Sequence, residues 1–290
     1  MATNYAETLA AHNERIRTLT EWEGGDDRKL FRAIIDRSVT EICSEARIVC
    51  DHTFRDCSGL ITADFPLATS IGTYAFYQCD LLASVNIPLA TSIGDYAFAK
   101  CTSITDVNYP LVTSVGGYAF QYCDLLTSAN FPLVRVIGSG LFQYCDLLTS
   151  VNFPSATNIG TNGFCYCTSL VSAKFESVTT VSQYAFQGCS KLETIDFHKV
   201  TSFGGTFIFN RCSKLTTVII RSETVCKMSN ANVLSNTPIK SGTGYVYVPS
   251  ALVDTYKAAT NWSTYANQFR ALEDYTVDGT ITGELDTTKI

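Results

Sequence analysis

Residues 79–100 read CDLLASVNIPLATSIGDYAFAK, and this pattern returns along most of the chain. The cysteine that opens it recurs at steps of 22 residues, with one last step of 23. A fixed period of this length is the signature of a solenoid, in which each coil stacks on the one before it. The sequence therefore predicts an α/β repeat solenoid of 22-residue coils. The cysteine column comprises Cys57, Cys79, Cys101, Cys123, Cys145, Cys167, Cys189 and Cys212.

The first half of the coil predicts a strand. Apolar and polar residues alternate from Leu82 through Val85 to Ile87, as they do in a strand with one buried face. Pro88 follows and ends the strand, because proline has no N–H to donate to a ladder. Equivalent strands of successive coils are expected to stack as one long, curved parallel sheet.

The second half of the coil predicts a return path and a tight turn. Ile93 is followed by Gly94, which is expected to provide a flexible corner. Phe98 and Cys101 then stand three residues apart, so they point to the same side of a short helical turn. One coil cannot bury these apolar positions alone, so the array needs neighbouring coils and a cap at each end.

Composition limits the classes of partner. Of the 290 residues, 46% are hydrophobic and 17% are charged, and the formal net charge is −6. Binding of nucleic acid or of an anionic membrane needs clustered Lys and Arg, and the chain has no such cluster. The N-terminus has no secretory signal pattern, and no apolar stretch is long enough for a membrane helix. Neither nucleic-acid binding nor membrane insertion is expected, and the compartment stays open.

The chain has 12 cysteines, a number that in a small secreted domain would suggest disulfides. Most of them belong to the periodic column, where neighbouring side chains point the same way. A disulfide needs converging Cβ atoms. We therefore interpret the column as buried free thiols that fill a small apolar slot.

The repeat resembles the BspA-like leucine-rich repeat, also called the Treponema pallidum type. That family repeats an A-F-x-x-C-x-x-L-x-x-I-x-(I/L)-P frame, which appears here over residues 75–88 as AFYQCDLLASVNIP. The resemblance covers roughly residues 44–226 and recurs coil after coil. It implies a right-handed leucine-rich-repeat coil. It also implies a kinship with bacterial surface proteins that bind host matrix proteins or other cells.

The period divides the chain into an N-terminal helix (1–24), an N-terminal cap (25–56), the solenoid (57–226) and a C-terminal cap (227–290). In the first segment, apolar residues recur at spacings of three and four, as in a coiled coil. The segment is either a helix packed on the first coil or a short stalk that joins copies of the chain into a homo-oligomer.

The C-terminal cap is predicted to contain a strand, two helices and a hairpin. Residues 245–249 read YVYVP and predict a strand ended by proline. Ser250 is expected to cap a helix that runs to about Ala259. A second helix is expected over residues 262–272, and Asp278-Gly279 predicts the turn of a terminal hairpin.

Catalysis finds no support in the sequence. The chain has three histidines, and none lies in a nucleophile, metalloprotease or phosphate-binding motif. Asp196 and His198 stand two residues apart but have no evident third ligand for a metal. Cys165 and Cys167 are also two apart, and Cys167 belongs to the buried column. We expect neither an enzyme nor a cofactor nor a metal.

The outward positions of the strands form the first candidate binding surface. They present a neutral polar column, which either forms ladders of hydrogen bonds between coils or binds a glycan or a protein. This column comprises Asp64, Asn86, Asn108, Asn130, Asn152, Lys174 and Asp196.

The tight turns form the second candidate surface. Tyr122, Tyr144 and Tyr166 precede the column cysteine in three consecutive coils. Because Phe120 and Cys123 point inward, the tyrosine between them is expected to point outward. The three rings either form an aromatic stripe that binds a partner or stack on one another and stiffen the turn.

Residues 174–199 break the uniform repeat and form the third candidate. Lys174 stands where earlier coils have asparagine, and His198 stands where they have proline. Such a break marks either a partner site or the approach to the cap, where polarity aids solubility.

These observations favour a non-enzymatic module that presents a solenoid surface to a protein or glycan partner, with adhesion at a cell surface as the function that the resemblance implies. The alternative is a structural part of a larger assembly, such as a virion tail or an oligomeric scaffold, joined through residues 1–24.

Overall fold

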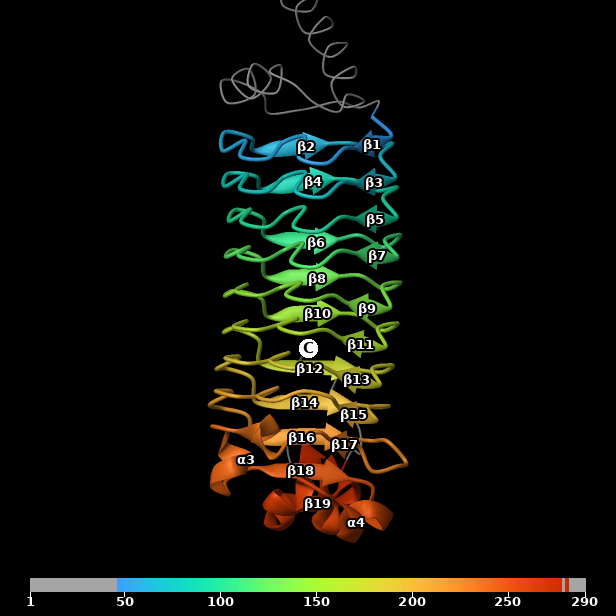
Figure 1. Cartoon of the computed structure of the whole chain (residues 1–290), viewed down its shortest axis with the longest axis vertical. Coiled ribbons are helices and arrows are strands. Elements are labelled where there is room, and N and C mark those ends of the chain that lie inside the picture. The colour runs from blue at the N-terminus through green and yellow to red at the C-terminus, as the bar shows by residue number, and fades with distance from the viewer. Residues whose placement is uncertain (1–45, 278–279, 282–290) are drawn as a thin grey trace, which may run out of the picture.

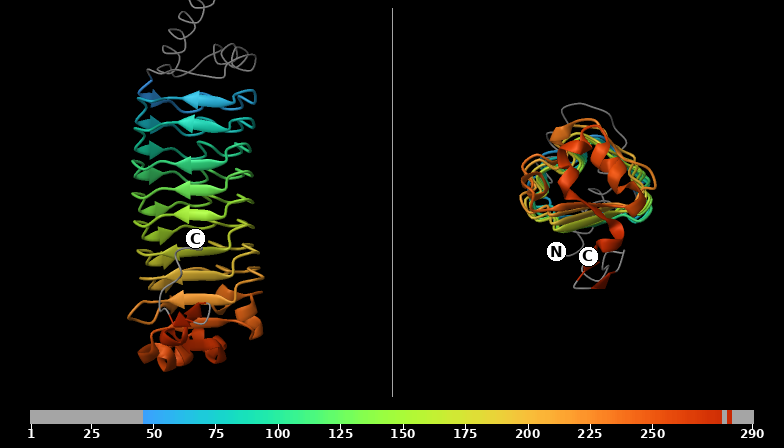
Figure 2. Two further views of the ribbon diagram at one scale, coloured as in Figure 1. Left: turned by 180° about the vertical axis from the view of Figure 1, so that it is seen from behind. Right: turned by 90° about the horizontal axis from the view of Figure 1, so that it is seen from below.

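Each coil contributes two short strands to a stack, which the computed structural model describes over residues 46–277 and 280–281. Figure 1 shows the coils following one another from β1 to β19, and Figure 2 shows them nearly superimposed when seen from below. The axis is close to straight in both side views, so the expected curvature is slight. The predicted residues 1–24 and most of the predicted cap 25–56 lie outside the described residues.

The first strand of each coil lies on one surface, here called the strand face. These strands are parallel and pair at equivalent residues, for example Val151 with Ala129 and Phe175 with Phe197. They are β2 (Thr62–Asp64), β4 (Ser84–Asn86), β6 (Asp106–Asn108), β8 (Ser128–Asn130), β10 (Ser150–Asn152), β12 (Ser172–Phe175), β14 (Thr194–Phe197), β16 (Thr217–Ile220), β18 (Tyr245–Val248) and β19 (Phe269–Ala271).

The strand face is not the single continuous sheet that the repeat predicts. Its hydrogen-bonded sheets are β2–β4, β6–β8–β10 and β12–β14–β16–β18–β19. At the first division, the larger Tyr109 replaces the Ile or Phe of other coils, and its hydroxyl donates to the Val85 carbonyl at 3.5 Å. The column of strands is therefore continuous in space, while its hydrogen bonding is divided.

A second column of two-residue strands forms on the return path of the coil. They also pair in parallel, as two sheets. They are β1 (Ile48–Val49), β3 (Ser70–Ile71), β5 (Ser92–Ile93), β7 (Ser114–Val115), β9 (Val136–Ile137), β11 (Asn158–Ile159), β13 (Thr180–Val181), β15 (Ser202–Phe203) and β17 (Lys227–Met228). Because β1 pairs with β3, the stack already begins before residue 57, the expected start of the solenoid.

The glycine at the predicted corner has a different role from the one expected. Gly94 has no positive φ, so it does not serve as a flexible hinge. A Cβ atom on Gly94 would lie 2.6 Å from the backbone nitrogen of Thr73 in the preceding coil. Glycine is needed there because the backbones of neighbouring coils approach too closely for any side chain.

The core consists of columns of identical side chains. Cys123 is fully buried, and its thiol donates to the carbonyl of Phe98 at 3.3 Å. Equivalent thiol–carbonyl bonds recur from Cys79 to Cys212. The phenylalanine of each turn stacks on that of the next, as Phe98 does on Phe120 at 5.3 Å. The column cysteines from Cys79 to Cys212 are free thiols, as the sequence predicts.

The C-terminal cap closes this core. Trp262 is buried and donates from its ring nitrogen to the Cys226 carbonyl at 2.6 Å, while the hydroxyl of Tyr256 accepts from the Cys226 N–H at 2.8 Å. The cap contains the elements η1 (Ala231–Leu234), α3 (Pro238–Ser241), η2 (Ser250–Leu252), α4 (Val253–Ala258), η3 (Trp262–Gln268), η4 (Leu272–Asp274), β20 (Thr276–Val277) and β21 (Thr280–Ile281).

Two details of the cap differ from the sequence prediction. Ser250 makes no side-chain cap, because its hydroxyl bonds to Glu273 at 3.2 Å instead. The second helix ends at Gln268, because Phe269–Ala271 pairs with β18 as the last strand of the sheet. The solenoid sheet thus extends well past residue 226.

Candidate functional site

The tight turn of each coil holds two residues with left-handed backbone conformation. They stand two residues before and two residues after the buried turn phenylalanine, and their φ values lie between 53° and 74°. Such a conformation costs a residue with a side chain about 1–2 kcal/mol. One column comprises His52, Tyr74, Tyr96, Tyr118, Gly140, Asn162, Tyr184 and Phe207, and the other comprises Asp56, Gln78, Lys100, Tyr122, Tyr144, Tyr166, Gly188 and Arg211.

The tyrosines singled out in the sequence come together as predicted. Tyr144 stacks on Tyr122 with ring centroids 4.6 Å apart and on Tyr166 at 5.1 Å, with interplanar angles of 8° and 10°. Tyr122 is 37% exposed, so the stack reaches the surface. Burial and the neighbouring phenols raise the pKa of Tyr144. Tyr122, Tyr144 and Tyr166 are here called the second tyrosine stack.

A further tyrosine stack precedes it along the chain, and the sequence analysis missed it. Tyr96 stacks on Tyr74 at 4.8 Å and on Tyr118 at 4.9 Å, with planes within 7° of parallel. His52 continues this stack at 5.1 Å from Tyr74. The repeated spacing of 22 residues between these three tyrosines is the signal that would have revealed it. Tyr74, Tyr96 and Tyr118 are here called the first tyrosine stack.

Each stack ends on a glycine. A Cβ atom on Gly140 would lie 2.2 Å from the ring of Tyr118, and one on Gly188 would lie 2.5 Å from the ring of Tyr166. The last ring therefore packs on bare backbone. Beyond Gly188, Arg211 reaches back and donates to the Tyr166 hydroxyl at 3.4 Å.

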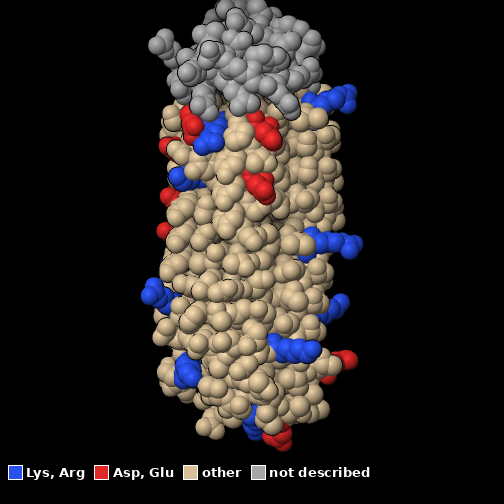
Figure 3. Space-filling model, viewed as in Figure 1, with Lys and Arg blue, Asp and Glu red and all other residues tan. Residues whose placement is uncertain are grey.

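The asparagines of the strand face form a ladder among themselves. Asn130 donates to Asn108 and Asn152 donates to Asn130, both at 2.7 Å, and Asn86 donates to Asp64 at the same distance. The hydrogen-bonding alternative is thus the arrangement found. On the opposite side of the solenoid, which faces the viewer in Figure 3, few charged side chains lie in the middle of the body.

The charged residues near the cap form an ion-pair cluster rather than an open surface. Asp196 is fully buried, contrary to its expected outward position, because Arg221 of the next coil holds both carboxylate oxygens with its Nε at 3.0 Å. His198 Nε2 lies 3.7 Å from Asp196, and burial lowers the pKa of His198 despite the carboxylate. Lys174 pairs with Glu176 at 3.4 Å. The break in the repeat therefore coincides with a cluster of ion pairs close to the cap.

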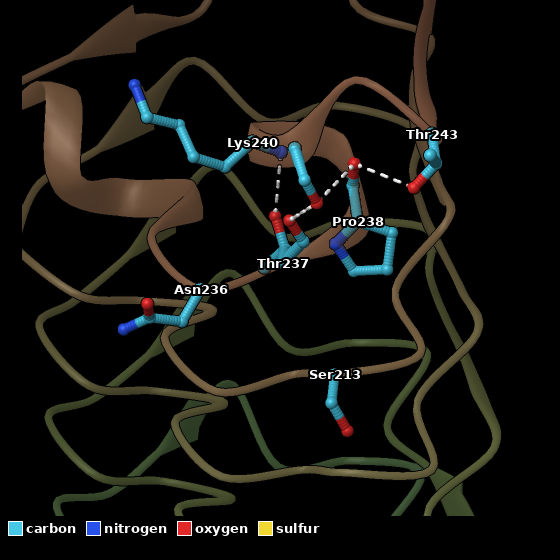
Figure 4. Close-up of a pocket in the computed structure, with 7 residues that line it drawn as sticks. Ser213, Asn236, Thr237, Pro238, Lys240 and Thr243 are labelled. Carbon is cyan, nitrogen blue, oxygen red and sulfur yellow. Dashed lines mark hydrogen bonds between the residues drawn. The ribbon is translucent and has the colours of Figure 1, made fainter.

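A shallow pocket of about 380 Å³ lies at the start of the C-terminal cap (Figure 4). Its polar groups serve the local backbone: the Thr237 hydroxyl accepts from the Lys240 N–H at 3.2 Å, and Thr243 donates to the Pro238 carbonyl at 3.2 Å. The Lys240 ammonium lies over the ring of Tyr265, 5.1 Å from its centre. These contacts tie Thr237, Lys240 and Thr243 of the pocket to the surrounding structure.

Two kinds of structural feature are absent from the described residues. Over 46–277 and 280–281, no three His, Cys, Asp or Glu side chains come together as a metal-binding group. In the same part of the chain, no helix has both the length and the apolar character needed to cross a membrane.

Comparison with known proteins relates the chain to a repeat family and to solved repeat structures. The family model described as "BspA type Leucine rich repeat region" matches residues 28–148 and 135–250, with six copies of the repeat. No curated protein matches the chain.

Among solved structures, a leucine-rich repeat protein from Bacteroides ovatus is 23% identical with a TM-score of 0.57, and the match covers 73% of this chain and 59% of that one. This chain therefore spans about three fifths of that protein, and the likeness is one of fold.

Two weaker matches have TM-scores below 0.5. A leucine-rich cell surface protein from Faecalibacterium prausnitzii has a TM-score of 0.43 at 18% identity, covering 80% of this chain and 86% of that one. A leucine-rich repeat protein from T. pallidum has a TM-score of 0.37 at 22% identity, covering 45% and 76%.

Proposed function

The chain belongs to the BspA type leucine-rich repeat family, and from this premise we propose that it is a non-enzymatic binding module. Its partner is a protein or a glycan, and the recognition surface is the edge formed by the tight turns. Adhesion at a cell surface, which the family resemblance implies, is the setting that we propose for this recognition.

The observation that carries the proposal is the presence of two tyrosine stacks in left-handed backbone positions. Gly140, Asn162 and Gly188 occupy the same two columns in other coils, and these residue types adopt that conformation with little strain. The six tyrosines of the stacks are therefore not required by the turn. Exposed aromatic groups are typical of binding surfaces, because they offer a large, stiff contact area with a polar tip.

The strand face supports the proposal by contrast. The side chains of Asn108, Asn130 and Asn152 satisfy one another along the ladder. A partner on this face would compete with hydrogen bonds that already exist, whereas a partner on the turn edge would cover exposed ring edges.

The test is a binding screen of the purified protein against glycan and extracellular-matrix arrays. The variant replaces Tyr122, Tyr144 and Tyr166 by asparagine, which removes the rings but tolerates the left-handed backbone. The matched control replaces Asn108, Asn130 and Asn152 of the strand face by serine.

Loss of binding in the tyrosine variant alone is the expected result. Loss in the asparagine control alone would move the site to the strand face and contradict the proposal. Absence of binding in all three proteins would contradict a module for these ligand classes, and the oligomeric mass from light scattering would then test the assembly role of residues 1–24.

A further inference from the structure

The second tyrosine stack lies beside a repeated pair of exposed side chains. Residues 121–128 and 143–150 are identical, QYCDLLTS. In each copy a turn closes from the cysteine to the second leucine, with Leu126 N–H donating to Cys123 at 3.1 Å and Leu148 N–H donating to Cys145 at 3.2 Å. An aspartate and a leucine occupy the central positions of each turn and are exposed. They are Asp124, Leu125, Asp146 and Leu147.

The two aspartates of this surface are stacked like charges. Equivalent positions in neighbouring coils lie about 4.8 Å apart, and two like charges at such a distance repel each other. Burial and the charge of Asp146 raise the pKa of Asp124. Within the described residues, neither carboxylate has an ion-pair partner.

Some other acidic side chains of the solenoid are neutralised by a cation. Glu193 pairs with Lys214 at 3.6 Å, and Asp196 pairs with Arg221 at 2.9 Å. Asp124 and Asp146 differ from these residues, because they are two carboxylates at equivalent positions of neighbouring coils and have no cation beside them in the described part of the chain. Beside them, the side chains of Leu125 and Leu147 are 46% and 44% exposed. The surface combines apolar contact area with two negative charges.

The ring geometry restricts what can bind here. Within the second tyrosine stack, the centroid distances of 4.6 and 5.1 Å mean that the rings cover one another's facing surfaces. The stack consequently offers ring edges and hydroxyl groups rather than open faces on which a sugar could stack. A glycan platform is disfavoured for this reason, and a protein partner is favoured.

The spacing of the charges favours a helical partner. Side chains four residues apart on a helix lie about 5–6 Å apart at Cβ, close to the coil spacing of about 4.8 Å. Side chains on one face of a strand are about 6.6 Å apart, which matches less well. A helix that lies along the solenoid axis could thus place one cation on each aspartate and its apolar residues on the leucines.

We propose that the surface formed by the second tyrosine stack, Asp124, Leu125, Asp146 and Leu147 docks a basic amphipathic helix of a partner protein, with Lys or Arg at positions i and i+4. This proposal deepens the proposed function and rests on it, because it names the partner class of the same edge.

The probe is a synthetic helical peptide of roughly 20 residues of Ala, Leu and Lys, with lysines at i and i+4. A second peptide has the same composition with its lysines at i and i+2. Fluorescence anisotropy measures the affinity of both for the full chain near physiological salt. The variant is Asp124→Asn with Asp146→Asn, and the matched control is Asp64→Asn with Asp106→Asn, which removes the same charge from the strand face.

The expected result is that the first peptide binds more tightly than the second, and that the Asp124/Asp146 variant weakens binding about five- to tenfold while the control changes it less than about twofold. Equal weakening by variant and control would reduce the effect to net charge and overturn the proposal. Failure of the first peptide to bind would also overturn it, while loss of array binding in the tyrosine variant would still support the proposed function.

Discussion

Replacing Tyr144 by alanine and by glycine should reverse the usual order of stability of these two residues. Tyr144 has φ 63° and stacks on two rings. Both variants lose two ring contacts, about 0.5–1.5 kcal/mol each. Alanine retains the left-handed strain of about 1–2 kcal/mol, which glycine does not have. Glycine instead stabilises the unfolded state by about 0.4–1 kcal/mol, because it gives the unfolded chain more conformational freedom. The glycine variant should therefore be the more stable one by about 1 kcal/mol.

Urea unfolding of both variants measures this difference, provided that the slope m is unchanged. Gln143 is the matched control, since its φ is not positive. There alanine should be more stable than glycine by about 0.5–1 kcal/mol. If the alanine variant of Tyr144 is as stable as the glycine variant or more stable, Tyr144 does not have the backbone strain inferred from its φ.

Three further results are expected. In the same urea titration, Gly94→Ala should destabilise the protein by more than about 1 kcal/mol, because the new Cβ would lie 2.6 Å from a backbone nitrogen. The control Gly204→Ala should be nearly neutral, because the nearest atom to its Cβ would be 3.8 Å away. Arg221→Met should lower the free energy of unfolding by about 3 kcal/mol, because it leaves the buried carboxylate of Asp196 without its arginine. Adding Asp196→Asn should restore most of this stability. No recovery in the double variant would contradict the role of the ion pair. Burial raises the pKa of the Cys165 thiol to about 12, so on raising the pH the thiol ionises first in the unfolded state. The free energy of unfolding should therefore fall above about pH 8.5, by about 1.4 kcal/mol per pH unit for each such thiol. Urea unfolding at pH 7 and at pH 10 measures this loss, and equal stability at the two pH values would contradict it.

The columns of the core could be predicted from the sequence because each depends on one coil compared with the next. The cysteine period predicts the stack, and the alternation from Leu82 to Ile87 predicts a strand whose place agrees with β4. The free thiols follow from the parallel direction of their side chains. These inferences need no knowledge of contacts between distant residues.

The remaining features depend on geometry that residue types do not reveal. Tyrosine has no preference for left-handed backbone, so Tyr74 and Tyr144 gave no sign of their conformation. The burial of Asp196 depends on Arg221, which lies 25 residues later and outside the regular step. Likewise, Phe269–Ala271 becomes a strand only because β18 offers it a free edge.

The identical octapeptides 121–128 and 143–150 show that the same eight residues fit two successive coils, each with its cysteine and its second leucine buried in the core. Each added or deleted coil would change the length of the rod by about 4.8 Å and leave the columns in register. The number of coils thus sets the distance between the second tyrosine stack and the C-terminal cap. Duplication and loss of coils would let evolution adjust that reach independently of the stability of the fold.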